Sequence, residues 1–225
     1  MSSIASGLTF QLVAPANAEV ARPIDVVAIS WPGAPALENS VNQLRAVIDN
    51  YTIGYWQRQA RIDFVDGVTD QDILQMSSEV PCLGDSTVSY MNQISAKFYE
   101  KQRLNGGNRY LIVLMPKISG NCIWAAKSFV GDYHNPYGMT ILQDAIQPNV
   151  ITHELGHSLG LGHTNLMQCN GTPDGDWKSC ENLEYAGAID MMSNFSIQGP
   201  LNIYDKWRIH SVDSLFIQSV MKSSD

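Results

Sequence analysis

The sequence predicts an α+β protein, with a mixed, twisted β-sheet and helices in an N-terminal lobe (about residues 1–160). A smaller, irregular C-terminal lobe (about 161–225) is expected to end in a helix. Helix-like and strand-like patterns alternate before residue 145, as in a sheet covered by helices. Between 160 and 194, Gly and Asn are frequent and the hydrophobic periodicity is weak. No repeat or linker divides the 225 residues, so we expect one domain.

The expected strands are β-rich or apolar segments, and the expected helices carry apolar residues at intervals of three and four. The strands are Ile24–Trp31, Arg61–Val65, the apolar run Tyr110–Met115, and two weaker segments, Cys122–Val130 and Gly138–Leu142. The helices are Ala36–Asn50, Val88–Leu104, a helix from Gln147 or Asn149 to about Leu159, and a last helix from the N-cap Asn202 to Val220.

The composition argues against two classes of function. The net charge is −8, from 22 acidic and 14 basic side chains, and no cluster of Lys and Arg could follow a phosphate backbone, so nucleic-acid binding is excluded. No apolar stretch approaches the roughly 20 residues that cross a bilayer. The Ala-Asn-Ala sequence at Ala16–Ala18 resembles a signal cleavage site, but no positive charge precedes it, so we do not interpret it as one. We expect a monomer.

The four cysteines are Cys82, Cys122, Cys169 and Cys180, and none has the CxxC spacing of a structural zinc site or a redox motif. Two disulfides are favoured, with Cys169 bonded to Cys180 across a local loop and Cys82 to Cys122 across distant segments. Three connectivities remain possible from sequence alone. Disulfides favour a secreted, extracellular protein. The alternative is four buried free thiols in a cytosolic protein.

The most informative segment runs from His153 to His163 and reads HELGHSLGLGH. On a helix, His153 and His157 project from one face, so both imidazoles can reach one metal ion, and Glu154 lies beside that face. His163 can join them only if the helix breaks, and Gly160 is suited to the positive φ of such a break. Three histidines leave a fourth position open for water, as in a catalytic zinc site.

This segment resembles the extended zinc-binding signature of the metzincin metallopeptidases. Downstream, Asp190–Asn194 resembles the Met-turn of the gametolysin-like group, and Leu201–Trp207 is similar to the helix start that follows that turn. We choose Met192 as the methionine of the turn because a small residue follows it, with Met191 as the rival. The resemblance covers about residues 150–210 and implies that this methionine forms an apolar floor beneath the histidines. Two features depart from it. No Tyr follows Met192 where astacins and serralysins carry a fifth ligand, and Thr164 is not typical of the best-known subfamilies.

The motif and the resemblance together predict a zinc-dependent metalloendopeptidase of EC 3.4.24 type that acts on a protein or peptide. One Zn²⁺ is held by His153, His157 and His163, and Glu154 is the general base. Two alternatives stay open. One is a metzincin-fold binding or toxin-like module without proteolysis, and the other is a zinc amidase acting on a non-protein substrate.

Four further interpretations concern segments around the motif. An extended substrate is expected to pair along Ile123–Val130, and Asn194–Gly199 either walls the pocket for the side chain after the cleaved bond or is a plain loop. The segment around Cys82 resembles a cysteine switch that blocks zinc. A switch belongs in a propeptide ahead of the catalytic domain, whereas this segment follows two predicted strands and a helix in the sequence. Calcium is possible but unsupported, since solvated turn residues are the commoner explanation for the candidate side chains. Those candidates are Asp174, Asp176 and Asp190.

Overall fold

The structure is a computed structural model that describes residues 21–209, except 83, 119–121, 123, 136, 170–176, 188 and 195–198. Four sequence interpretations fall wholly or partly outside these residues. They concern the signal-like segment Ala16–Ala18, most of the proposed pocket wall Asn194–Gly199, the calcium candidates Asp174 and Asp176, and the last helix beyond residue 209.

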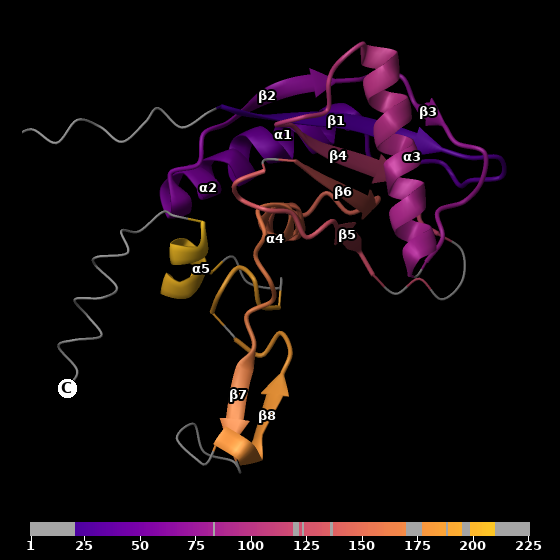
Figure 1. Cartoon of the computed structure of the whole chain (residues 1–225). Coiled ribbons are helices and arrows are strands. Elements are labelled where there is room, and N and C mark those ends of the chain that lie inside the picture. Colours follow the sequence, from indigo (N-terminus) through magenta and orange to yellow (C-terminus); the bar gives the residue numbers. More distant parts are fainter. Residues whose placement is uncertain are drawn as a thin grey trace, which may run out of the picture.

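A six-stranded mixed sheet forms the centre of the protein (Figure 1). The main path runs in the order β2-β1-β4-β6-β5, and the short strand β3 pairs with the end of β1. All pairs are parallel except β5 with β6, which is antiparallel and leaves β5 at one end of this order. The strands are β1 (Arg22–Ser30), β2 (Phe64–Thr69), β3 (Leu74–Gln75), β4 (Tyr110–Met115), β5 (Ala126–Ser128) and β6 (Gly138–Gln143).

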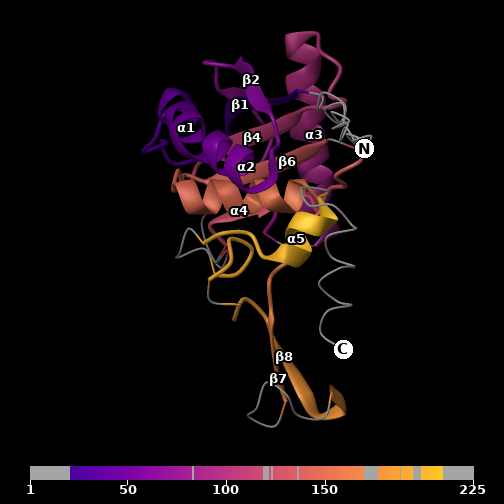
Figure 2. The same cartoon turned by 90° about the vertical axis from the view of Figure 1, so that its left-hand side faces the viewer.

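Helices cover both faces of the sheet (Figure 2). One face packs against α3 (Asp85–Gln102), and the other packs against α1 (Val41–Val47), α2 (Ile53–Ala60) and α4 (Pro148–Ser158). Side chains alternate between the faces of a strand, so Val27 of β1 points toward α3 whereas Val26 points toward α4. Every residue of β4 and β6 is buried, as expected for parallel strands covered on both sides.

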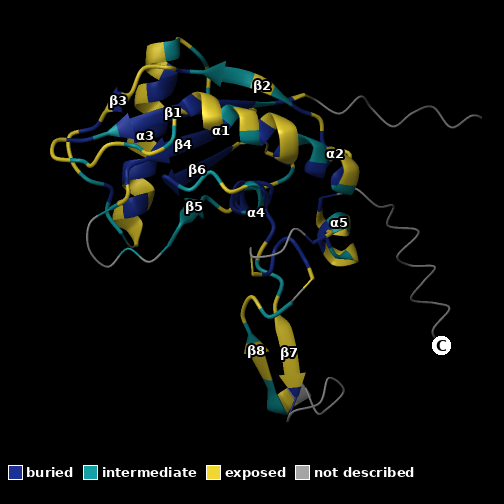
Figure 3. Ribbon diagram, turned by 180° about the vertical axis from the view of Figure 1, so that it is seen from behind, coloured by how far each residue is buried: buried dark blue, intermediate teal, exposed yellow. Residues whose placement is uncertain are grey.

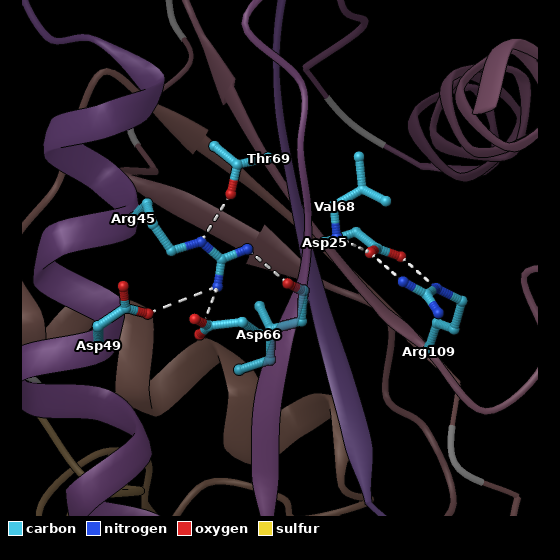
Figure 4. A network of polar contacts seen from close by, with 8 residues as sticks. Asp25, Arg45, Asp49, Asp66, Val68, Thr69 and Arg109 are labelled. Carbon is cyan, nitrogen blue, oxygen red and sulfur yellow. Dashed lines mark hydrogen bonds and ion pairs between the residues drawn. The ribbon is translucent and has the colours of Figure 1, made fainter.

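Polar contacts on both faces of the sheet tie β1 to its neighbours (Figure 4). The fully buried Asp25 accepts hydrogen bonds from Arg109 Nε at 2.6 Å and from the main-chain N–H of Val68 at 2.7 Å. Arg45 of α1 donates to Thr69 Oγ1 at 2.8 Å. These bonds satisfy a charge that would otherwise be costly to bury, and they hold β2 beside β1.

The first helical region differs from its predicted bounds, Ala36–Asn50. A capping box at Ser40, in which Gln43 N donates to Ser40 Oγ at 3.2 Å, starts the helix five residues later than predicted. The helix then continues through one π-helical segment, η1 (Ile48–Thr52), and through Gly54 to Ala60, because Ile48 and Trp56 are buried in the core on this face of the sheet. Arg61, at φ 57°, ends it. The strand predicted at Arg61–Val65 therefore begins only at Phe64 and runs on to Thr69.

The region from Leu166 to Leu183 was predicted to be irregular, and that prediction was wrong. It contains an antiparallel hairpin of β7 (Leu166–Cys169) and β8 (Cys180–Leu183), with a short 3-10 helix, η2 (Trp177–Ser179), before β8. The hairpin extends away from the sheet and is mostly exposed (Figures 1 and 3). A strand exposed on both faces has no alternating apolar pattern, which is why the sequence did not reveal it.

The structure pairs all four cysteines as the sequence favours. Cys169 and Cys180 face each other across the hairpin, and Cys82 is bonded to Cys122. After the hairpin, Asn202 caps α5 (Ile203–Arg208), with its side chain accepting from Asp205 N at 2.8 Å. Among the described residues, no helix is both long and apolar enough to span a membrane.

Candidate metal centre

Helix α4 places two histidines side by side beneath the sheet. His153 and His157 lie one turn apart, and their ring centroids are 4.8 Å from each other. Both are buried, because α4 packs its apolar side chains into the core it shares with β1 and β4. The core therefore fixes the position of these two imidazoles.

The chain turns sharply at Gly160 to bring in a third histidine. Gly160 has φ +90°, and its N–H and that of Leu161 donate to the carbonyls of His157 at 2.8 Å and Gly156 at 3.0 Å. A side chain at Gly160 would be strained at this φ and would place its Cβ 3.0 Å from Gly131 O. The turn carries His163 back until its ring lies 4.7 Å from that of His157.

The three histidines each offer one nitrogen, and these nitrogens all lie within 4.8 Å of one another, so the group could hold a metal ion. The Nδ1 atom of each ring has a hydrogen-bond acceptor. These acceptors are Met191 O for His153 at 2.8 Å, Leu161 O for His157 at 2.9 Å, and Glu184 Oε1 for His163 at 2.7 Å. An acceptor at Nδ1 assigns the proton to Nδ1 and leaves the Nε2 lone pair for a metal.

The chemistry of this donor set fits a metal ion that binds imidazole nitrogen. Burial lowers the pKa of His153 to about 4 and also lowers that of His157, so both rings are neutral at neutral pH. A neutral imidazole is the form that ligates a metal. Three protein ligands also leave room for a further ligand, which a closed structural site does not.

Glu154 lies next to His153 and points toward strand β5. Its side chain is 8% exposed, and burial raises the pKa of the carboxyl to about 7, although a hydrogen bond with Ser128 acts in the opposite direction. Ser128 belongs to β5, and its Oγ is 2.5 Å from Thr140 Oγ1 on β6. The carboxyl group therefore lies between α4 and the terminal strand of the sheet, with Ser128 as a polar partner.

Both methionines of the predicted Met-turn are fully buried, but they contact α4 differently. Met192 packs directly against the helix, since a Cβ added to Gly156 would meet its Sδ at 2.4 Å. Met191 contributes its carbonyl oxygen to His153. Of the two side chains, that of Met192 thus lies against the helix segment between the first two histidines.

A buried carboxylate, Asp190, organises the turn around these methionines. It accepts hydrogen bonds from Met192 N at 2.6 Å, Asn202 N at 2.5 Å and Thr164 Oγ1 at 2.8 Å. Thr164 follows His163 directly, Met192 belongs to the turn, and Asn202 caps α5. The Asp190 side chain therefore links three segments of the C-terminal region. Its oxygens face donors, which is not the environment of a calcium ligand.

The sequence analysis did not assign Glu184 and Tyr185 to the site. Glu184 accepts from His163, and the Tyr185 ring lies over that imidazole, with the centroids 3.9 Å apart. Burial raises the pKa of the Tyr185 phenol, and Glu184 and Glu154 raise it further. The segment Glu184–Gly187 resembles the gametolysin-like group in sequence, but that resemblance gave neither residue a role. Their position beside His163 follows from the hairpin register, which pairs Leu166 with Leu183.

The structure excludes a cysteine switch at Cys82, in agreement with the disulfide that the sequence favours. The sulfur of Cys82 is bonded to Cys122, so no free thiol is available there to occupy the histidine centre. This disulfide instead ties the start of α3 to the segment that leads into β5.

Comparison with solved structures identifies the fold. The crystal structure of metalloproteinase-II from Bacteroides fragilis aligns with a TM-score of 0.51 and 15% identity, covering 89% of this chain and 56% of that one. The chain has a metalloproteinase fold. The crystal structure of OgpA from Akkermansia muciniphila aligns at a TM-score of 0.46 and 13% identity, over 85% of this chain and 60% of that one. The chain thus spans little more than half the length of either neighbour. No protein-family model and no curated protein sequence matches it.

Proposed function

We propose that this protein is a secreted, zinc-dependent endopeptidase of the metzincin class, most similar to the gametolysin-like group. We further propose that residues 1–225 form one catalytic domain. The observation that carries the proposal is the convergence of three histidine nitrogens within 4.8 Å, beside the buried carboxyl of Glu154. The metalloproteinase fold and the two disulfides support it.

The donor set favours zinc, which takes three imidazoles and keeps an open position in catalytic sites. When bound, zinc supplies Lewis-acid chemistry, lowering the pKa of water toward about 7 and polarising a carbonyl. Glu154 takes a proton from the attacking water and delivers it to the nitrogen of the leaving amine as the C–N bond breaks. A carboxyl with a pKa of about 7 can both accept and return a proton near neutral pH. Met192 forms the apolar floor beneath the histidines and takes no part in proton transfer.

Strand β5 is the part of the sheet best placed to receive an extended substrate. It ends the strand order, and its Ser128 contacts Glu154, so a peptide paired along β5 would pass the general base. Main-chain pairing with a terminal strand is a general mode of peptide recognition. This narrows the candidate segment Ile123–Val130 to Ala126–Ser128 and its flanks.

The test is hydrolysis of a peptide library by the zinc-loaded protein, with and without a chelator. Cleavage at internal peptide bonds that the chelator abolishes would support an endopeptidase. Zinc binding without cleavage would favour a non-proteolytic module, whereas release of ammonia or of a non-peptide acyl group would favour an amidase.

The variant Glu154→Gln tests the general base. We expect kcat/KM to fall about 10³-fold because the amide cannot accept the proton, while zinc affinity stays unchanged. The matched control is Glu100→Gln, an exposed glutamate on α3 across the sheet, which should retain full activity. Undiminished turnover by Glu154→Gln would overturn this mechanism.

A further inference from the structure

Tyr185 packs against one ring of the candidate metal centre and lies near a second. Its ring centroid lies 3.9 Å from that of His163, tilted by 39°, and 6.4 Å from that of His153. The His153 and His163 rings are themselves 5.5 Å apart. A tyrosine stacked on the outer side of His163 would lie much farther from His153 than this, so the Tyr185 ring lies beside the centre rather than behind it.

Burial raises the pKa of the Tyr185 phenol, and the carboxylates of Glu184 and Glu154, which belong to different regions of the chain, both raise it further. The Tyr185 side chain remains 37% exposed, so part of the ring is open to a bound molecule. A hydroxyl in this position can donate a hydrogen bond, because a phenol is protonated at neutral pH.

The backbone holds Tyr185 in an unusual conformation. Its φ is +62°, a left-handed value that is uncommon for a residue with a bulky side chain. The main-chain N–H donates to Asn165 Oδ1 at 3.2 Å, and the preceding Glu184 is bonded to His163. Packing against His163 alone does not require a hydroxyl group, and residues kept in unfavourable conformations cluster at functional sites.

We propose that Tyr185 is a catalytic residue of the proposed peptidase, whose phenolic hydroxyl donates a hydrogen bond to the oxygen of the scissile carbonyl as negative charge develops there. The hydroxyl acts as one member of an oxyanion hole. It forms no covalent bond and keeps its proton. This assignment rests on the proposed function, since it requires a carbonyl substrate at the histidine centre.

The test compares the wild type with Tyr185→Phe, which keeps the ring over His163 and removes only the hydroxyl. Three quantities are measured on the full-length, zinc-loaded protein: zinc affinity by chelator competition, the Kd of acetohydroxamate by calorimetry, and kcat and KM for a cleaved peptide. We expect a fall in kcat of about 100-fold with KM and zinc affinity unchanged, as for the loss of one oxyanion donor. The Kd of acetohydroxamate should rise about tenfold, since an anionic oxygen loses one hydrogen-bond donor.

Tyr51→Phe is the matched control, because Tyr51 is an exposed tyrosine on η1, and all three quantities should stay at wild-type values. Unchanged kcat in Tyr185→Phe, or a loss of zinc affinity that accounts for the loss of activity, would overturn the proposal and leave Tyr185 a packing residue. If the wild type cleaves no peptide, the proposed function fails, and the acetohydroxamate titration still decides the role of Tyr185. Equal affinity in both proteins would overturn it, and weaker binding by the variant would support it.

Discussion

The structure describes most of two regions, residues 21–160 and 161–209, and each region is stabilised by a different kind of interaction. In the first region, β4 and β6 are completely buried and α4 packs into their core, so His153, His157 and Glu154 stand on a hydrophobic scaffold. In the second, Met191, Met192 and Leu201 also pack into this core, but the hairpin is mostly exposed, and polar bonds to Asp190 and one disulfide supply much of the remaining order. The candidate metal centre therefore joins a scaffold buried throughout to a region that depends in addition on a few directional contacts.

The two disulfides offer the largest test of this difference. Replacing Cys82 and Cys122 with Ser opens a loop of 40 residues in the sheet region. We expect the free energy of unfolding to fall by about 4 kcal/mol, from the entropy regained by the unfolded chain. Zinc affinity of the remaining folded protein should not change. Urea unfolding and chelator competition measure the two quantities.

Replacing Cys169 and Cys180 with Ser should instead affect zinc affinity more than the free energy of unfolding. The hairpin that this bond closes extends from the body, so its loosening should lower the global free energy of unfolding by less than about 1 kcal/mol. It should weaken zinc binding about tenfold, because the hairpin positions Glu184 against His163. Equal losses of stability in both double variants would contradict the comparison.

The contact between Gly156 and Met192 joins the two halves and gives an intermediate effect. A Cβ at Gly156 would meet Met192 Sδ at 2.4 Å, so Gly156→Ala should displace the methionine and cost about 2 kcal/mol by overpacking. Combining it with Met192→Ala should recover part of the loss. Gly162→Ala is the control, since nothing lies within 4 Å of its Cβ. Thermal unfolding of the wild type, the three single variants (Met192→Ala included) and the double variant checks this, and additive losses in the double variant would refute the contact.

A smaller effect concerns the buried Asp205 of α5. Burial and the nearby Asp190 raise its pKa to about 6, from a usual value near 4. Between these values the folded state binds more protons than the unfolded state, so the contribution to stability is complete below about pH 4 and is lost as pH rises toward about 6. Relative to Asp205→Asn, the metal-free wild type should lose about 1 kcal/mol between pH 4.5 and 7.5. Urea unfolding at each pH measures this difference, and a constant difference would contradict it.

The same division explains how much could be predicted from the sequence. Buried parallel strands are continuous apolar runs, so Tyr110–Met115 was predicted with the bounds that the structure gives. The histidine spacing on α4 follows from helix geometry, and the positive φ of Gly160 follows from the need to return His163. The hairpin leaves no such pattern, since Leu166 and Met167 are both exposed. Contacts that depend on the register of the hairpin, such as that of Tyr185 with His163, could therefore not be predicted from the sequence.

The bounds of the first helical region could not be predicted correctly, for a separate reason. The start of α1 depends on the side-chain bonds of Ser40 and Gln43, and its continuation beyond Asn50 depends on burial of Ile48 and Trp56 against the sheet. Helix ends set by such contacts cannot be read from periodicity alone.

The hairpin has a further consequence for how this protein can change. His163 lies three residues before β7, and Glu184 comes directly after β8, so the base of the hairpin is anchored on both sides. Its far end lies away from the sheet. Insertions or an attached fluorescent label at that end should therefore leave the imidazole and its carboxylate in place, because both lie at the opposite end of the hairpin. The hairpin is therefore a suitable place to attach further domains to this protein.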